Sequence, residues 1–195
     1  MEDLLRQNIQ RTIGHSISDL EFEQFSKFLF PKSFDKKAIL SDEGEHCKYV
    51  YFILKGSAYS YFVNEHGDKH AIQFALEGYW ITDHYSFFSG KPGIYTIETL
   101  EPSQILVLNQ DNYEKICRSN HMFEHFFRIL IQNAFIGLQY RLAKTNSEDA
   151  EHRYNEFSNL HPAFVQRIPQ YLIASYLGIK PQSLSRIRKE NFGKK

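Results

Sequence analysis

Near the C-terminal end, four polar side chains recur at helical spacing. They are Gln182, Ser183, Arg186 and Lys189. If residues 181–190 form a helix, Leu184 and Ile187 face inward and the polar set faces solvent. An arginine fork or a glutamine amide can hydrogen-bond base edges, and a lysine can bind phosphate as a point charge. The chemistry that this spacing favours is recognition of nucleic acid.

The surrounding residues have the signature of a helix-turn-helix. Ala174 is small enough to let two short helices touch, and Gly178 can take the positive φ that a tight turn needs. Pro169 and Pro181 suit the first turns of the two helices, where a missing N–H costs little. Apolar residues fill the positions that such a unit buries: Ile173, Leu177, Ile179, Leu184 and Ile187. We therefore predict a helix-turn-helix here, the alternative being an ordinary helical hairpin.

Charge is distributed unevenly, although the whole chain is formally neutral. Residues 161–195 carry seven cationic side chains and one acidic side chain, a net charge of +6, so residues 1–160 carry −6. The cations are Arg167, Lys180, Arg186, Arg188, Lys189, Lys194 and Lys195. Because attraction to phosphate depends on the local field, this basic segment favours a nucleic-acid partner.

Length and composition limit the protein class. The 195 residues are 42% hydrophobic and 15% aromatic, enough for one good core and a small second domain. No apolar run approaches the roughly 18 residues of a membrane span, and residues 1–14 lack the apolar stretch of a secretory signal. We therefore expect a cytoplasmic protein without a membrane partner. Cys47 and Cys117 are too few for a disulfide framework, which favours packing roles.

Short β-rich runs alternate with turn residues between about positions 34 and 109. The runs cover residues 48–54, 58–63, 71–76, 95–100 and 104–108. Glycines recur at intervals of eleven or twelve residues from Gly44 to Gly90. Strands that return through tight turns give this pattern, so we predict an all-β sandwich, barrel or roll. Capping-box patterns that start at Ser18 and Asp111 predict helices before and after it.

A longer helix is predicted from about His121 to Lys144, with a further helix to about Leu160. Apolar side chains cover more than half of the longer helix, so it must be covered twice. We expect one side to pack on the β domain and the other to meet its copy in a second subunit, although burial within one subunit stays open. The residues assigned to this subunit contact are Phe123, Phe127, Leu130, Ala134 and Leu138.

The order of a glycine-punctuated β-roll, a long apolar helix and a helix-turn-helix resembles the Crp/Fnr family of bacterial transcription regulators. The strongest similarity lies in YLIASYLGIKPQSLSRIRK and GEHCKYVYFILKGSAYSYFV. The resemblance implies an α+β fold: an antiparallel, cyclic-nucleotide-binding-like β-roll, a dimerisation helix and a small helical helix-turn-helix domain. We expect these parts at residues 1–120, 121–145 and 146–195. The chain ends too soon for the β-hairpin wing that normally follows, so the last domain should lack a full wing.

The family resemblance also implies function. It indicates a homodimeric regulator that binds palindromic double-stranded DNA, with RNA polymerase as a further partner and no enzymatic activity. The alternative is a ligand-sensing or partner-binding module without DNA-regulatory activity. Arg186 and Gln182 are the expected base readers, and Lys180, Arg188 and Lys189 the expected phosphate contacts. The complete expected DNA-binding set is Lys180, Gln182, Ser183, Ser185, Arg186, Arg188 and Lys189.

Departures from the family pattern fall in residues 80–95. Members that bind cyclic AMP carry a Gly-Glu-Leu segment and an Arg-Ser or Arg-Thr pair, whereas the matching positions here are 82–84 and 93–95. Without that arginine a buried phosphate would lack its cation, and Asp83 would repel it, so cyclic AMP is not expected to bind. The aromatic surroundings leave open a neutral or apolar effector or a filled core without effector. The candidate pocket comprises Trp80, Thr82, Asp83, His84, Tyr85, Ile94 and Tyr95.

Patterns for metal binding and catalysis are weak. His121 and His125 have a spacing that can chelate, but no third ligand is indicated. His66, His70 and Glu77 raise a cupin-like metalloenzyme as a rival, but the His-x-His spacing usual for that fold is absent. No glycine-rich phosphate loop with a lysine and no triad motif occurs, so we expect no enzyme, no cofactor and no metal site.

Overall fold

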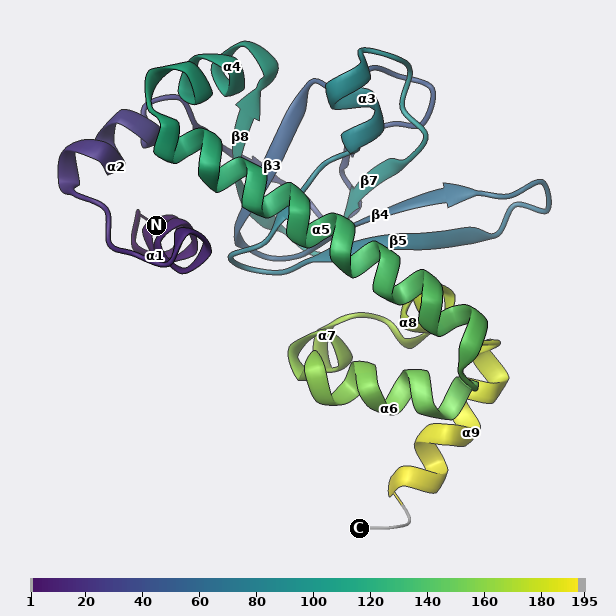
Figure 1. The fold of residues 1–195 in the computed structure, drawn as a ribbon. Coiled ribbons are helices and arrows are strands. Elements are labelled where there is room, and N and C mark those ends of the chain that lie inside the picture. The colour runs from purple at the N-terminus through teal and green to yellow at the C-terminus, as the bar shows by residue number, and fades with distance from the viewer. Residues whose placement is uncertain (1, 193–195) are drawn as a thin grey trace. The chain divides into compact units, whose positions relative to one another are not determined.

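The computed structural model describes residues 2–192, and Lys194 and Lys195 lie outside the described residues. The chain forms two compact units, Met1–Phe62 with Gln73–Ala134, and Val63–Ile72 with Phe135–Lys195 (Figure 1). The described helices are α1 (Glu2–Ile13), α2 (Asp19–Ser26), α3 (His84–Ser89), α4 (Gln110–Ser119), α5 (His121–Ser147), α6 (Ala150–Leu160), α7 (Pro162–Arg167), α8 (Gln170–Leu177) and α9 (Pro181–Phe192). The strands are β1 (Phe30–Phe34), β2 (Ile39–Ser41), β3 (Tyr49–Lys55), β4 (Ala58–Val63), β5 (Lys69–Ala75), β6 (Trp80–Ile81), β7 (Thr96–Thr99) and β8 (Ser103–Asn109).

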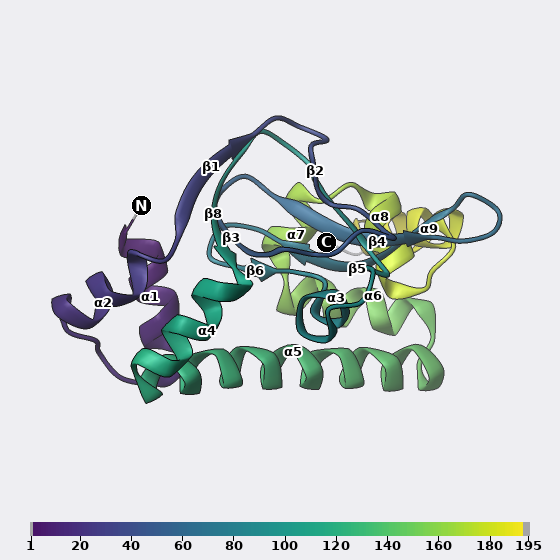
Figure 2. The same cartoon turned by 90° about the horizontal axis from the view of Figure 1, so that it is seen from above.

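The predicted β-roll consists of two four-stranded sheets. Their strand orders are β1-β8-β3-β6 and β2-β7-β4-β5 (Figure 2). β3 and β8 pair antiparallel with Tyr51 opposite Val107. Alternate side chains of β3 pack in two different hydrophobic clusters, because successive residues of a strand point to opposite faces. Tyr51 and Ile53 are buried in the cluster with Ile97 and Ile105, whereas Phe52 packs in a separate cluster with residues of the helices.

Helices α1, α2, α4 and the first half of α5 supply that second cluster (Figure 1). Phe25 lies at its centre, with its ring centroid 5.1 Å from that of Phe123 and 5.7 Å from that of Phe126. Burying each such ring contributes about 1.5–3 kcal/mol relative to leaving it exposed. The start of α5 is therefore fixed to its own β-roll.

Helix α1 was not expected from the sequence. Leu5, Ile9 and Ile13, which lie four positions apart, form its buried face. This spacing is typical of an amphipathic helix.

Two of the predicted helix starts are confirmed and two are wrong. Ser18 and Glu21 form a complete capping box at α2, and Pro181 is the first residue of α9. The second capping box is wrong, since the Asn109 side chain caps α4 by accepting from the N–H of Asn112 at 2.8 Å. Pro169 is the N-cap of α8 and thus precedes its first turn.

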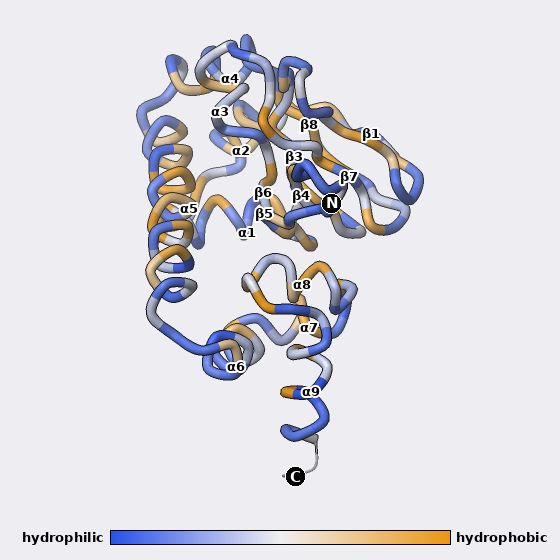
Figure 3. The backbone as a smooth tube through the Cα atoms, turned by 90° about the vertical axis from the view of Figure 1, so that its right-hand side faces the viewer, coloured by the Kyte–Doolittle hydropathy of each residue, from blue (hydrophilic) through white to orange (hydrophobic). Residues whose placement is uncertain are grey.

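In the second unit, helices α6–α9 contribute the aromatic and aliphatic side chains of a small core. Tyr154, Phe157 and Phe164 are buried on α6 and α7, and Leu172, Ile173 and Leu177 on α8. α9 is hydrophilic over most of its length (Figure 3). Across residues 2–192, no helix combines the length and apolar character that a bilayer span requires.

Candidate functional site

The turn between α8 and α9 has the geometry that the sequence predicts. Gly178 ends α8 in the left-handed conformation, with φ 64° and ψ 37°. Ala174 is fully buried, and its carbonyl oxygen accepts a hydrogen bond from the N–H of Ile179 at 2.9 Å. A side chain at position 178 would be strained because left-handed φ disfavours a Cβ. The small residue and the glycine together allow α9 to leave α8 at a sharp corner.

Arg153 of α6 holds this corner from outside the predicted motif. Its Nε donates to the carbonyl oxygen of Leu177 at 3.0 Å, and its Nη2 donates to that of Gly178 at 3.2 Å. These bonds satisfy carbonyl groups that the end of a helix leaves without intrahelical partners. The sequence offers no signal for this role, since Arg153 lies about 25 positions before the turn.

Four side chains on α9 form one exposed surface. Gln182, Ser185, Arg186 and Lys189 are all exposed and follow the i, i+3, i+4, i+7 spacing of one helix face. We call these four the recognition stripe. The opposite face is buried through Leu184 and Ile187, which are 1% and 4% exposed. Of the other expected DNA-binding residues, Lys180 is exposed before the helix, and Ser183 and Arg188 are half-buried beside the stripe.

The structure divides the expected effector-pocket residues between two places. Trp80, Thr82 and His84 line a pocket of about 520 Å³ in the first unit, a size within the usual range for ligand sites. The indole Nε1 of Trp80 donates to Asn8 Oδ1 at 2.9 Å. Burial lowers the pKa of His84, which keeps its imidazole neutral near pH 7 despite the opposing effect of the adjacent carboxylate. Tyr85 is exposed, outside this lining.

Asp83, Ile94 and Tyr95 meet at the second place. Asp83 is fully buried, and its Oδ2 accepts from the N–H of Ile94 at 2.8 Å and of Tyr95 at 3.2 Å. Its Oδ1 accepts from the N–H of Ser86 at 3.2 Å, which caps the first turn of α3. Three backbone N–H groups thus form an anion site that the chain's own carboxylate fills. From the sequence, only a repulsive role could be predicted for Asp83, because residues 83 and 94 meet only in the fold.

The fold of this chain is similar to that of known proteins. The protein-family model for the cyclic nucleotide-binding domain matches residues 31–120 of this chain. FixK2 from Bradyrhizobium japonicum is similar in structure with a TM-score of 0.72, 16% identity and 85% of each chain covered. The chain has the Crp/Fnr fold. A Crp/Fnr-family protein from Eubacterium rectale gives a TM-score of 0.67 at 13% identity, covering 89% of this chain and 83% of its own.

CLP from Xanthomonas campestris, a global regulator responsive to c-di-GMP, has the same fold. Its TM-score is 0.68 at 10% identity, with 91% of this chain and 93% of CLP covered. No curated protein matches this chain by sequence. The Crp/Fnr fold confirms the expected α+β architecture, with its antiparallel β-roll and C-terminal helices.

The predicted subunit contact on the long helix α5 is partly wrong. Phe123 and Phe127 were expected at a subunit contact, but both are buried in the chain's own core and Leu130 packs against it. Leu138, another residue of the expected contact, is 51% exposed and belongs to an apolar row further along α5 with Phe135 and Leu142, which are 59% and 63% exposed. With half-buried Ile131 they are spaced four, three and four positions apart, the pattern of a coiled-coil seam. We call these four residues the α5 seam; Ala134 is exposed beside it.

Metal ligands do not converge in the part of the chain that the structure describes. No group of three His, Cys, Asp or Glu side chains is placed to hold an ion. His121 lies beside Glu124 at 3.7 Å, and His125 bonds with Arg128 at 2.6 Å. His70 bonds with the side chain of Asn64 at 2.9 Å. Each of these histidines interacts with a neighbouring side chain and not with a set of metal ligands.

Proposed function

We propose that this protein is a DNA-binding transcriptional regulator of the Crp/Fnr type, that it acts as a homodimer in the cytoplasm, and that it is not an enzyme. The observation that carries the proposal is the recognition stripe, four polar residues exposed on a helix whose other face is buried in a helix-turn-helix. Two further features support the proposal. Arg153 of α6 hydrogen-bonds to the turn between α8 and α9, and residues 161–195 carry a net charge of +6. RNA polymerase is a further proposed partner.

The recognition stripe suits a major groove. A symmetric dimer should bind a pseudo-palindrome whose half-sites lie about one helical turn apart. Arg186 is the proposed guanine reader through its bidentate fork, and Gln182 the proposed adenine reader. Lys180, Arg188 and Lys189 are proposed to hold phosphates, with Ser183 and Ser185 beside them. Base contacts set sequence preference, whereas phosphate contacts set affinity.

Two variants separate these roles. Arg186→Ala is expected to cost about 1–3 kcal/mol per half-site on the preferred operator and to relax its sequence preference. Lys189→Ala should weaken binding to all duplexes alike and reduce the salt slope by about one per subunit. Fluorescence anisotropy on operator and scrambled duplexes at several salt concentrations measures both effects. Equal weakening of the two duplexes by Arg186→Ala would show that it does not read bases.

The wild-type protein tests the proposal itself. Electrophoretic mobility of a generic duplex at low salt should change on addition of the protein, because the basic segment attracts phosphate irrespective of sequence. A protein that shifts no duplex under these conditions is a ligand-sensing or partner-binding module instead. The 520 Å³ pocket beside Trp80 favours that second function, and a neutral effector is the ligand it would accept.

Cyclic AMP and cyclic GMP are expected not to bind with a dissociation constant below roughly 100 μM. Asp83 fills the backbone N–H site in the segment that matches the family's nucleotide-binding positions. A cyclic phosphate there would have to displace a buried carboxylate or lie beside it, and like charges at close range repel. Titration calorimetry measures this directly; a micromolar isotherm would mean that the nucleotide has another site.

A further inference from the structure

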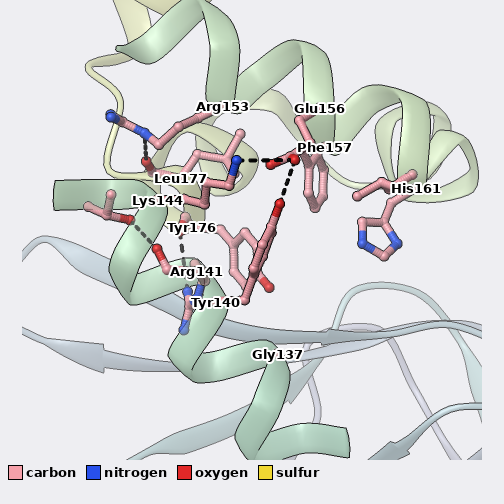
Figure 4. Close-up of a pocket in the computed structure, with 12 residues that line it drawn as sticks. Gly137, Tyr140, Arg141, Lys144, Arg153, Glu156, Phe157, His161, Tyr176 and Leu177 are labelled. Carbon is pink, nitrogen blue, oxygen red and sulfur yellow. Dashed lines mark hydrogen bonds and ion pairs between the residues drawn. The ribbon is translucent and has the colours of Figure 1, made fainter. Parts of the chain in front are cut away.

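We infer that the second unit binds a small aromatic carboxylate in a pocket between α5, α6 and α8 (Figure 4). The pocket has a volume of about 160 Å³. An apolar cavity of about 150 Å³ accommodates benzene, so the size fits one ring and not a nucleotide. The proposed site is separate from the pocket beside Trp80 and from the recognition stripe, because its lining shares no residue with either.

Aromatic side chains from three helices form its walls. Tyr140 comes from α5, Phe157 from α6 and Tyr176 from α8, and Figure 4 shows their rings grouped around one space. The Phe157 and Tyr176 centroids lie 5.6 Å apart. His161 lies beside Phe157, and burial lowers its pKa, so its ring adds a flat wall without charge near pH 7. Such walls favour a planar ligand, because offset stacking and edge contacts add to burial.

The charged side chains of the lining favour an anion. Three are cationic, Arg141, Lys144 and Arg153, and one is acidic, Glu156. Glu156 is already balanced, since its Oε1 accepts from the Tyr140 hydroxyl at 2.6 Å and lies 3.4 Å from Lys144 Nζ. Lys144 is also paired with Glu148. The carboxylate of a ligand would therefore not find its partner in Lys144.

Arg141 has N–H groups that can donate hydrogen bonds to the carboxylate of a ligand. Its guanidinium lies 4.2 Å from the centroid of the Tyr176 ring, and its Nη1 donates to the Tyr176 carbonyl oxygen at 3.2 Å. One bond uses a single donor of five, and the stacking fixes the plane of the group. A fixed guanidinium beside an aromatic space matches a carboxylate on a ring, because the fork can bind both oxygens.

Gly137 leaves one side of the pocket open. It lies in the interior of α5, where glycine is less favourable than alanine, and a Cβ built on it would meet nothing within 4 Å. Packing within the described chain therefore does not require a glycine here. The α5 seam does not require it either, because in the heptad that places Phe135 and Leu138 at the seam positions Gly137 falls on another face. A side chain at position 137 would occupy part of the pocket, so space for a ligand explains the glycine.

Benzoate is the probe and benzyl alcohol its neutral control. We expect the full chain to bind benzoate with a dissociation constant of about 0.1–1 mM by titration calorimetry, and benzyl alcohol at least roughly 10-fold more weakly. Gly137→Leu should fill the pocket and abolish binding of both probes. Gly137→Ala, the matched control, should retain benzoate binding. Both variants should melt no lower than the wild type, since each removes a helical glycine.

Arg141→Gln separates charge recognition from shape. It should lower benzoate affinity about 10-fold and leave benzyl alcohol affinity unchanged, which a damaged pocket would not do. Equal affinities of the wild type for both probes would overturn the anion assignment. Benzoate binding to Gly137→Leu as to the wild type would overturn the location, and no binding at about 10 mM would overturn the site. These titrations contain no DNA, so their failure is distinct from failure of the proposed function.

Discussion

Leu138→Asp is expected to convert the proposed dimer into monomers. The α5 seam would bring the two copies of Leu138 together across the axis, and two unpaired carboxylates there would cost several kcal/mol. The dimer dissociation constant should rise by about 1,000-fold or more. Analytical ultracentrifugation over a range of concentrations measures the change. Operator affinity should fall with it, because a single recognition stripe contacts only one half-site.

Asn133→Asp is the matched control for that experiment. It places the same new carboxylate on the exposed surface of α5, away from the seam, and should leave the dimer intact. Leu130→Asp would not serve, because Leu130 packs against the chain's own core and its replacement would disturb the first unit. Wild-type protein that stays monomeric at tens of micromolar would reject the seam as a subunit contact.

Asp83→Ala is expected to lower the stability of the first unit by about 3 kcal/mol or more. Three backbone N–H groups would lose their acceptor in a buried place, and each such loss costs about 1–3 kcal/mol. Scanning calorimetry should show a decrease in Tm of about 10 °C. Asp83→Asn, which keeps one acceptor oxygen, should lose less.

Formate provides a second measurement on Asp83→Ala. It supplies the carboxylate that the variant lacks, so it should raise the Tm of the variant and leave that of the wild type unchanged. An Asp83→Ala protein that melts like the wild type would show that the carboxylate contributes nothing to these N–H groups.

The parts of the fold that the sequence predicted are those with local signals. Ala174 and Gly178 define the corner of the helix-turn-helix by their own size and φ, and Ser18 with Glu21 defines the start of α2. β1 could not be predicted because it is an exposed edge strand. The Pro-Lys-Ser sequence at its centre shows neither apolar alternation nor a buried run. Sequence patterns therefore predict turns and helix caps well and the edge strands of a sheet poorly.

The site residues were predicted less well, because their roles depend on contacts between distant segments. The sequence showed that α5 is apolar on more than half of its surface, but it could not assign each side to its partner. Phe127 therefore appeared as a subunit contact, although Phe25 stacks on it at 5.8 Å. Asp83 reads as an unfavourable charge until residues 94 and 95 supply its donors.

Asp83 is joined covalently to the segment whose anion site it fills, which fixes its effective concentration. Dilution does not remove it, and a free metabolite must compete with a neighbour that is always present. A soluble phosphate at cellular levels would thus change the occupancy of this site very little. The β-roll then behaves as if this position were permanently occupied. Under the proposed function, a signal would reach the recognition stripe through the amount of protein or through a different surface.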